Sequence, residues 1–194
     1  IGIKPTPSIG GVGLIKDYKN MITMNFKEIN NLVLVIGKTE GHIDQSLFAR
    51  TILDEKNGPP PEINLFNEKN NGETMLQLIE KNFVKSAHDV SIGGLITAIS
   101  KMCIKGNKGI ELTKPKSLIS EIEYFFSEDQ GRYIIEIQPN DLDKVVKILD
   151  KNSVHYEKLG KIVQNHMTIN PKTNITIDEL KSYNTNWLTD YMSA

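Results

Sequence analysis

The sequence predicts an α+β fold in which helices pack in layers on a mixed β-sheet. Short apolar runs, such as residues 32–37 (LVLVIG), alternate with segments of helical period, such as residues 95–105. The strands and helices interleave without the strict strand–helix–strand repeat of a doubly wound sheet. This order favours a mixed sheet over a purely parallel one.

Length and charge limit the class of protein. The 194 residues suffice for one large domain or two small ones. The net charge is −1, and the 23 basic and 24 acidic residues are well mixed, so we expect no nucleic-acid partner. No apolar run approaches the roughly 18 residues of a membrane span, and no signal peptide opens the sequence. The single cysteine, Cys103, lies on the apolar side of a predicted helix. We interpret it as a buried hydrophobic residue in a reducing, cytoplasmic protein.

The first residues differ in composition from the rest. Residues 1–15 are rich in proline and glycine, and we predict a linker or crossover loop there. The loop lacks the lysine-hydroxyl ending of a nucleotide-binding P-loop. Residues 16–194 are predicted to form a single C-terminal α/β domain. Because the chain starts at Ile1 in this loop, we expect it to be a fragment of a longer, multidomain subunit.

The first half of the domain contains one clear strand and two predicted helices. The continuous apolar run at residues 32–37 predicts a strand buried on both faces. Asp44 is a candidate N-cap for a helix over residues 45–54. A second helix is predicted over about 72–82. The residues expected to face inward are Leu47, Phe48, Ile52 and Leu53 in the first helix, and Met75, Leu76, Leu78 and Ile79 in the second.

The second half begins with a short strand before Ala87, a turn over residues 88–94 and a helix to about Lys105. Asn140 or Asp141 is expected to cap a later helix. The other predicted elements are strands at residues 110–112, 133–138, 156–163, 166–170 and 176–177, and a final helix from Asp178. Residues 156–163 and 166–170 are predicted to pair through a turn at Gln164–Asn165. In the final helix, Trp187, Leu188 and Tyr191 share one side, which could pack on the core or form an interface.

Residues 86–95 (SAHDVSIGGL) have the order of a strand end, a tight turn and a helix start. Free N–H groups at a helix N-terminus bind phosphates and carboxylates, and paired glycines allow close approach. His88, Asp89, Gly93 and Gly94 are therefore candidate phosphate-binding residues. The alternative is a purely structural turn, in which His88 holds the backbone by hydrogen bonds. We prefer that structural role for His88, because no partner nucleophile is evident in the sequence.

The two arginines stand out beside 21 lysines. Arg132 is a candidate for planar contact with a phosphate or carboxylate, a contact that lysine cannot make. The alternative for Arg132 is a salt bridge to Glu128 or Glu136, and Arg50 is interpreted as an interface or surface group. The remaining histidines show no ligand spacing with one another or with Cys103, so we predict no metal site; they are His42, His155 and His166.

Four segments together resemble one known family. They are residues 6–15 (TPSIGGVGLI), 41–65 (GHIDQSLFARTIL with GPPPEINL), 86–95 and 125–132 (FFSEDQGR). In this order and at similar spacing, they resemble the C-terminal end of the synthetase subunit of phosphoribosylformylglycinamidine synthase. That family belongs to a superfamily with aminoimidazole ribonucleotide synthetase and selenophosphate synthetase. In the synthase subunit, an ATP-binding domain and a C-terminal α/β domain occur as a pair twice, and this chain looks like the last domain.

The resemblance implies an ATP-dependent ligase of purine biosynthesis. ATP would activate the amide oxygen of formylglycinamide ribonucleotide, and ammonia would displace phosphate to give the amidine. The implied cofactors are ATP and Mg²⁺, bound by the full-length enzyme rather than by this fragment. The implied partners are the N-terminal domains of the same subunit, a glutaminase subunit and a small accessory subunit. The implied substrate is the ribonucleotide.

The resemblance carries few site residues to this chain. The family's catalytic histidine and main ATP and magnesium ligands lie in N-terminal domains that this chain lacks. Residues 127–132 resemble a substrate-contacting loop of the first domain pair, so Ser127, Glu128, Gln130 and Arg132 are candidates for substrate or phosphate binding. Because the two pairs are only pseudo-equivalent, we favour the alternative that the loop is a structural relic or an interface.

Two positions depart from the family pattern. Ile92 stands where members commonly carry an acid; either a ligand contact is lost, or Asp89 or Ser91 takes over a capping role. Asp44 replaces a residue that is often small. Two alternatives to the synthase assignment remain: a noncatalytic scaffold or docking domain, and another synthetase such as aminoimidazole ribonucleotide synthetase. Residues 41–65 argue against the second. We expect the isolated chain to fold but not to hydrolyse ATP, because it has no P-loop or magnesium-binding carboxylates.

Overall fold

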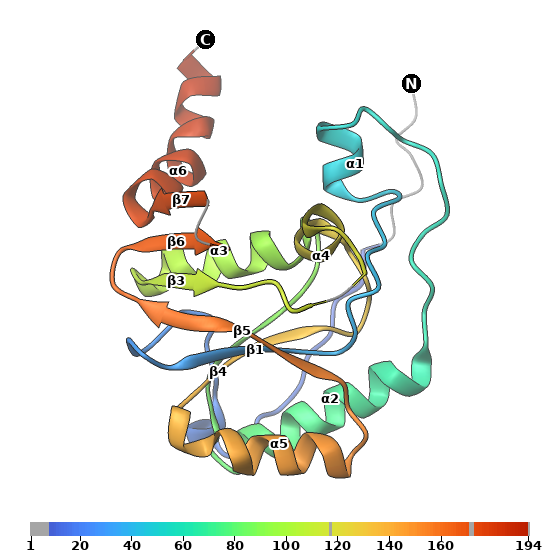
Figure 1. Ribbon diagram of the computed structural model, residues 1–194, viewed down its shortest axis with the longest axis vertical. Coiled ribbons are helices and arrows are strands. Elements are labelled where there is room, and N and C mark those ends of the chain that lie inside the picture. Colours follow the sequence, from blue (N-terminus) through green and yellow to red (C-terminus); the bar gives the residue numbers. More distant parts are fainter. Residues whose placement is uncertain (1–7, 117, 171–172, 194) are drawn as a thin grey trace.

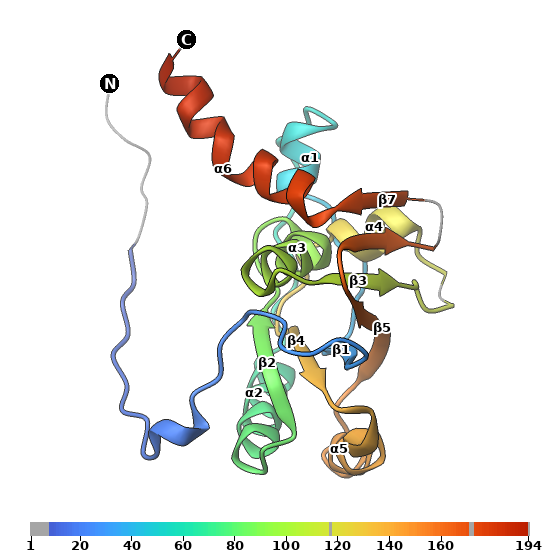
Figure 2. The same ribbon diagram turned by 90° about the vertical axis from the view of Figure 1, so that its left-hand side faces the viewer.

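The computed structural model describes residues 8–116, 118–170 and 173–193, and these form a layered domain around one mixed sheet (Figures 1 and 2). The sheet order is β2-β4-β1-β5-β3-β6-β7, and every neighbouring pair is antiparallel except β3 with β6. The strands are β1 (Leu32–Ile36), β2 (Val84–Asp89), β3 (Gly109–Leu112), β4 (Tyr133–Ile137), β5 (Tyr156–Val163), β6 (His166–Ile169) and β7 (Thr173–Thr176). The predicted α+β fold with a mixed sheet is confirmed.

Helices cover both faces of the sheet. Figure 1 shows α2 and α5 on one face and α3 and α4 on the other. The helices are α1 (Leu47–Thr51), α2 (Leu65–Glu80), α3 (Gly94–Gly106), α4 (Glu121–Phe126), α5 (Leu142–Lys151) and α6 (Ile177–Ser193). Two short 3₁₀ turns occupy Tyr18–Asn20 and Pro139–Asp141.

Strand β1 lies inside the sheet and contributes to two separate hydrophobic cores. Val33 and Val35 join the core beneath α3 and α4, whereas Leu34 and Ile36 join the core beneath α2 and α5. Successive side chains of a strand point to opposite faces, so a run without polar residues requires cover on both sides. The prediction of a strand buried on both faces is confirmed.

The helix predicted over residues 45–54 is shorter than expected. Helix α1 begins after Ser46, whose hydroxyl accepts the Ala49 N–H at 3.1 Å, so Asp44 is not its N-cap. Gln45 has a φ of +62°, which interrupts helical backbone between Asp44 and the first turn. The inward orientation was also wrong for three of the four predicted residues, because Leu47, Ile52 and Leu53 are exposed.

Helix α2 begins at Leu65, seven residues before the predicted start at 72. Its N-cap is Asn64, whose side chain accepts the Asn67 N–H at 3.0 Å. Asparagine and glycine have low helix propensity, so the first two turns (LFNEKNNG) do not look helical by composition. Met75 and Leu78 are buried as predicted, but Leu76 is 62% exposed.

Strands β5 and β6 do not pair as the predicted hairpin. Instead β3 lies between them, antiparallel to β5 and parallel to β6. Two glycines permit this close packing: a Cβ on Gly109 would overlap the His166 backbone, and one on Gly160 would overlap the Glu111 carbonyl. The prediction of a hairpin from the turn at Gln164–Asn165 was therefore wrong. Strand β3, roughly 50 residues earlier in the sequence, lies where the partner strand was expected.

Other local details also differ from expectation. Helix α4, which was not predicted, begins with a capping box between Ser120 and Glu123. A 3₁₀ turn precedes α5. Asp141 stands at the N-cap position of α5, as predicted, but its side chain accepts a hydrogen bond from Lys144 at 2.8 Å and makes no capping hydrogen bond. Strand β2 continues through Asp89, so the predicted turn over 88–94 begins two residues later.

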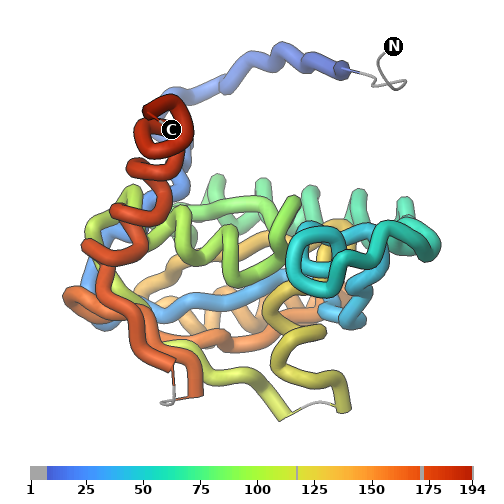
Figure 3. Tube along the Cα trace, turned by 90° about the horizontal axis from the view of Figure 1, so that it is seen from above, coloured from blue at the N-terminus to red at the C-terminus, as the bar shows by residue number. Residues whose placement is uncertain are grey.

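The described chain starts as an extended arm. Residues 8–19 are all exposed, and Phe26 is the first buried side chain of the described residues. Figures 2 and 3 show the arm running outside the layered body. The extended part thus continues past residue 15, the predicted end of the linker. Residues 1–7 of the predicted linker lie outside the described residues, and the domain boundaries stay a prediction.

No described helix combines the length and apolarity needed to span a membrane.

Candidate functional site

The loop at residues 127–132 (SEDQGR) joins α4 to β4 and contains four predicted site residues. Strand β4 is antiparallel to both β1 and β2, and its first residue, Tyr133, pairs with Ile36 and Asp89 at their ends. The loop before β4 therefore meets the segments that follow β1 and β2. The sheet register creates this meeting point from three distant parts of the sequence.

Asp129 attaches the loop to the segment after β1. Its Oδ2 accepts the N–H groups of Glu40 and Gly41 at 3.0 and 3.1 Å, and its Oδ1 accepts that of His42 at 3.1 Å. Hydrogen bonds to a charged acceptor are about twice as strong as neutral ones. Asp129 is 7% exposed and was absent from the predicted site, although its i, i+3 spacing to Arg132 is a usable signal.

Glu128 attaches the loop to two helix starts. Its Oε1 accepts the Leu47 N–H at 2.7 Å and the Gly93 N–H at 2.8 Å. Leu47 opens α1, and Gly93 directly precedes α3. The Gly93 N–H is one of the donors expected to bind a phosphate, and here an internal carboxylate occupies it. A role of Glu128 in substrate binding stays a prediction.

Arg132 is enclosed by its own loop and is 1% exposed. Its Nε donates to the Asp129 carbonyl at 3.2 Å, Nη1 to Thr39 Oγ1 at 3.1 Å, and Nη2 to the Ser127 carbonyl at 2.8 Å. Burial lowers the pKa of the guanidinium, and the Asp129 carboxylate, 3.8 Å away, opposes that shift. The predicted alternative of an ion pair with Glu128 or Glu136 is corrected, because the partner is Asp129. Phosphate contact by Arg132 stays a prediction, and it would require the loop to open.

Ser127 and Gln130 have opposite environments. Ser127 is fully buried, and its hydroxyl has no hydrogen-bond partner within the described part of the chain. Gln130 is exposed and lines a polar pocket of about 540 Å³. Other lining residues are Lys38, His42, Pro61, Asn64, Asn67, Glu68 and Asn71. Of the four loop residues predicted to contact a ligand, Gln130 is thus the one that faces an open pocket.

Gly94 allows close packing between α3 and α4, whereas a Cβ on Gly93 would meet Thr97 within α3. Gly93 and Gly94 have φ values of +86° and +70°, which favour glycine. A Cβ on Gly94 would lie 2.5 Å from the Ser127 carbonyl oxygen and 2.8 Å from that of Phe125. The start of α3 therefore touches the end of α4 backbone to backbone. A phosphate-binding role for these glycines stays a prediction.

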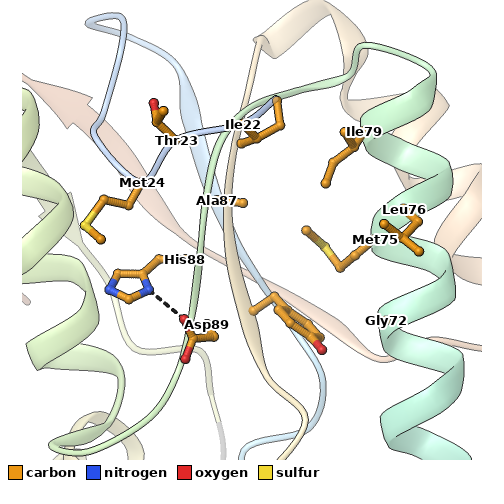
Figure 4. Close-up of a pocket in the computed structure, with 11 residues that line it drawn as sticks. Ile22, Thr23, Met24, Gly72, Met75, Leu76, Ile79, Ala87, His88 and Asp89 are labelled. Carbon is orange, nitrogen blue, oxygen red and sulfur yellow. Dashed lines mark hydrogen bonds and ion pairs between the residues drawn. The ribbon is translucent and has the colours of Figure 1, made fainter. Parts of the chain in front are cut away.

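His88 and Asp89 lie beside a second, apolar pocket of about 830 Å³ between β2, α2 and residues 22–24 (Figure 4). His88 Nδ1 donates to Asp89 Oδ1 at 3.0 Å, so the predicted backbone hydrogen bonds are replaced by a side-chain partner. Nε2 of His88 is buried without a hydrogen-bond partner among the described residues. Figure 4 shows His88 with Met24 on one side of β2 and Ala87 toward Ile79 on the other, as strand alternation requires. The two candidates therefore do not join the loop site.

A second buried carboxylate, Glu136 of β4, connects β2 to the segment before β1, and the sequence analysis did not predict this role. Its Oε2 accepts from the Lys27 N–H at 2.8 Å and the Ser86 hydroxyl at 2.7 Å. Its Oε1 accepts from the Glu28 N–H at 3.0 Å and the Asn31 amide at 2.7 Å. The signal was a single acid within the apolar strand YIIEI, since such a residue must be hydrogen-bonded.

The cysteine thiol and the potential metal ligands are the remaining reactive groups of the described residues. Burial raises the pKa of the Cys103 thiol to about 12, which confirms it as a buried hydrophobic residue. Among the described residues, no group of three or more His, Cys, Asp or Glu side chains could hold a metal ion. The loop at residues 127–132 can hold the segment after β1 and the starts of α1 and α3 in fixed relative positions.

Comparison with known proteins gives a consistent result. The family model described as "AIR synthase related protein, C-terminal domain" matches residues 28–170. The curated phosphoribosylformylglycinamidine synthase subunit PurL of Pelagibacter ubique is 67% identical over 192 residues, which cover 99% of this chain and 26% of that protein. The chain thus spans about a quarter of the length of this relative.

Solved structures show the same fold at low identity. The structure of T. maritima PurL complexed with FGAR has a TM-score of 0.69 and 17% identity, over 84% of this chain and 29% of that one. PurLQS from Thermotoga maritima has a TM-score of 0.65 and 19% identity, over 84% of this chain and 28% of that one.

Proposed function

Because the chain belongs to the family of AIR synthase related C-terminal domains, we propose that it is the last domain of the synthetase subunit of phosphoribosylformylglycinamidine synthase. The observation that carries this proposal is 67% identity over 192 residues to a protein of that name. The subunit is an ATP-dependent ligase of purine biosynthesis. It converts formylglycinamide ribonucleotide and ammonia to formylglycinamidine ribonucleotide.

The chemistry of this reaction takes place largely outside this chain. ATP activates the amide oxygen of the ribonucleotide, and ammonia then displaces phosphate to form the amidine. The family resemblance places the main ATP and magnesium ligands in other domains, so we assign ATP and Mg²⁺ to the preceding domains of the subunit. No catalytic step is assigned to a residue of this chain.

The role of this domain is structural: it holds chain segments in fixed positions near the site of reaction. The charged groups of Asp129, Glu128 and Arg132 each form hydrogen bonds to other groups of the same chain. Together they fix the segment after β1 and the starts of α1 and α3. This supports the relic or interface interpretation of residues 127–132.

Direct ligand contact is a second candidate, and one observation favours it. Gln130 is exposed at the polar pocket, whose rim also carries the ion pair of Lys38 and Glu40 at 2.7 Å. An amide at such a position could donate to or accept from a polar ligand. Among the predicted site residues, Gln130 is the one best placed for this role.

The proposed partners are a glutaminase subunit, which supplies ammonia, and a small accessory subunit. The resemblance supplies both, and the structural neighbour named PurLQS supports an assembly that includes PurL. We place the enzyme in the cytoplasm, where its substrate would be made.

The test uses the full-length subunit that contains this chain, assayed for amidine formation with ribonucleotide, ATP and an ammonium salt. We expect ammonia-dependent product; its absence in a folded subunit would overturn the assignment. The variant Gln130→Ala then separates the two roles of the domain. Scaffolding predicts a KM for the ribonucleotide within about twofold of wild type, as for the exposed control Gln164→Ala. A rise of about tenfold with Gln130→Ala alone would favour direct contact.

Binding to the 194-residue chain gives an independent check. We expect calorimetric titration to show no binding of the ribonucleotide, and none of ATP with magnesium. Saturable binding of the ribonucleotide would instead place a substrate contact within this domain.

A further inference from the structure

The outer half of α6 carries an apolar face that nothing in the described structure covers. Ile177, in the first turn, is fully buried, and Leu180 packs against the same core. The same side of the helix continues past the polar Asn184 to Trp187, Leu188 and Tyr191 at helical spacing. These three side chains are 61%, 52% and 74% exposed. The face that anchors the helix at its base is therefore solvent-exposed toward its tip.

The composition of this face matches a protein interface. Tyrosine, tryptophan and methionine are enriched in interface cores, and Tyr183 and Met192 extend the same apolar surface. The opposite side is polar, with Ser182, Thr185, Asn186 and Thr189. Residues 182–193 contain one charged residue, Asp190, and no lysine or arginine. Helices that lie on membranes usually carry basic residues on the polar face, so an apolar protein surface suits this helix better than an anionic lipid surface.

A second uncovered apolar segment lies on the same side of the domain. Ile9, Val12 and Leu14 in the extended arm are 94%, 104% and 98% exposed. Figures 2 and 3 both show the arm and the outer half of α6 projecting from one side of the sheet layers. Two apolar segments that project together are consistent with one large occupant.

The length of the relative indicates which occupant this is. The Pelagibacter protein shares 99% of this chain, including nearly all of α6, but the match covers only 26% of its own length. About three quarters of that polypeptide therefore lie outside the region that corresponds to this chain. We propose that the outer half of α6, residues 183–192, docks on the remaining part of the same synthase subunit. This inference rests on the proposed function, because it takes the chain to be one domain of that longer subunit.

Amide hydrogen exchange of the full-length subunit tests the proposal. A docked helix should exchange slowly at residues 183–192, whereas a free helix end should fray and exchange fast. The double variant Trp187→Ser and Tyr191→Ser should speed exchange in this segment at least about tenfold. The matched control, Thr185→Ala and Thr189→Ala, has the same spacing on the polar side and should stay within about twofold.

Each other outcome would overturn the proposal. Fast exchange in the wild-type segment means that α6 is free. Protection that appears only as the subunit dimerises, seen by light scattering, assigns the face to a second copy. Protection that requires addition of the glutaminase and accessory subunits assigns it to a separate partner. Amidine synthesis by the same preparation reports on the proposed function separately. A protected helix in an inactive subunit would contradict that function alone, and an unprotected helix in an active subunit would contradict only the docking.

Discussion

The loop at residues 127–132 and the outer half of α6 have opposite relations to their surroundings. The loop is polar and has the residue types of a binding site, yet Glu128, Asp129 and Arg132 are engaged by groups of the same chain. The helix is aromatic and has the residue types of a core, yet Trp187 and Tyr191 are exposed. Residue type alone thus does not tell which of these groups already have partners within the chain. The hydrogen bonds show that the loop has its partners within the chain, and the exposed side chains show that the outer half of α6 does not.

The energetic consequences of change should differ accordingly. Removing one partner of a buried charged network leaves the other partners unpaired, which is costly. Removing an exposed apolar side chain costs little unless another surface covers it. Helix α3 links the two regions, because its start packs on α4 through Gly94 and α6 packs beside it. The following tests apply to the purified 194-residue chain, which we expect to fold on its own.

The largest effect should come from Asp129→Ala. The change leaves three part-buried backbone N–H groups and the buried Arg132 guanidinium without their carboxylate. We expect the free energy of unfolding to fall by about 3–5 kcal/mol, measured by urea denaturation. Asp190→Ala, at an exposed aspartate in helix α6, is the control and should change it by less than about 0.5 kcal/mol. Equal effects of the two substitutions would show that the loop is not held as described.

A smaller loss should follow Gly94→Ala. The residue has a positive φ, and the new Cβ would meet the Ser127 carbonyl at 2.5 Å, so we expect a loss of about 1–3 kcal/mol. Gly72→Ala is the matched control within helix α2, where the nearest atom to the new Cβ is the Tyr133 hydroxyl at 3.6 Å. Alanine there should stabilise the chain by roughly 0.5–1 kcal/mol. The contact between α3 and α4 would be in doubt if both variants shifted stability in the same direction.

Cys103 in helix α3 should make the free energy of unfolding depend on pH in the alkaline range. Burial raises the pKa of Cys103 from 9.0 to about 12, so above pH 9 the unfolded chain ionises this thiol first. The free energy of unfolding is unaffected by this thiol below pH 9 and falls as the pH rises toward 12. The loss is about 1 kcal/mol by pH 10. We expect Cys103→Ala to reduce the slope of stability against pH in this range. Tyr124, whose pKa is raised by burial and by Glu157, is present in both the unsubstituted chain and the Cys103→Ala variant. The difference between their two slopes therefore reports on the Cys103 thiol alone. Parallel slopes would contradict burial of Cys103.

The smallest effect should come from Trp187→Ser. Because this side chain is 61% exposed, its loss should change the free energy of unfolding of the 194-residue chain by less than about 0.5 kcal/mol. Ile177→Ala, on the buried turn of the same face, should cost about 2–5 kcal/mol. Denaturation of the two variants therefore compares the anchored and free parts of one helix. A large loss with Trp187→Ser would mean that the outer half of α6 is covered within the chain itself.

Much of the fold follows from local patterns. The run LVLVI predicts β1 because only a strand covered on both faces can bury five consecutive apolar residues. The apolar period after Gly94 predicts α3 within one residue at each end. By contrast, α2 starts earlier than its composition indicates, since tertiary packing outweighs the low propensity of its asparagines. The resemblance of four segments to one family was equally accessible, because each motif is a short, ordered stretch of sequence.

The candidate site depended on contacts between distant segments. Asp129 bonds to residues 40–42, and Glu128 to Leu47 and Gly93, so no local pattern around residue 129 could reveal the partners. The insertion of β3 between β5 and β6 is hidden for the same reason. The sequence by itself determined most of the strands and helices, although not α4 or the first turns of α2, and the family, because hydrophobic period and motif order are local properties. Only the tertiary structure decided which strands are neighbours, which charges are already paired and which apolar face stays uncovered, because these depend on where the folded chain brings residues together.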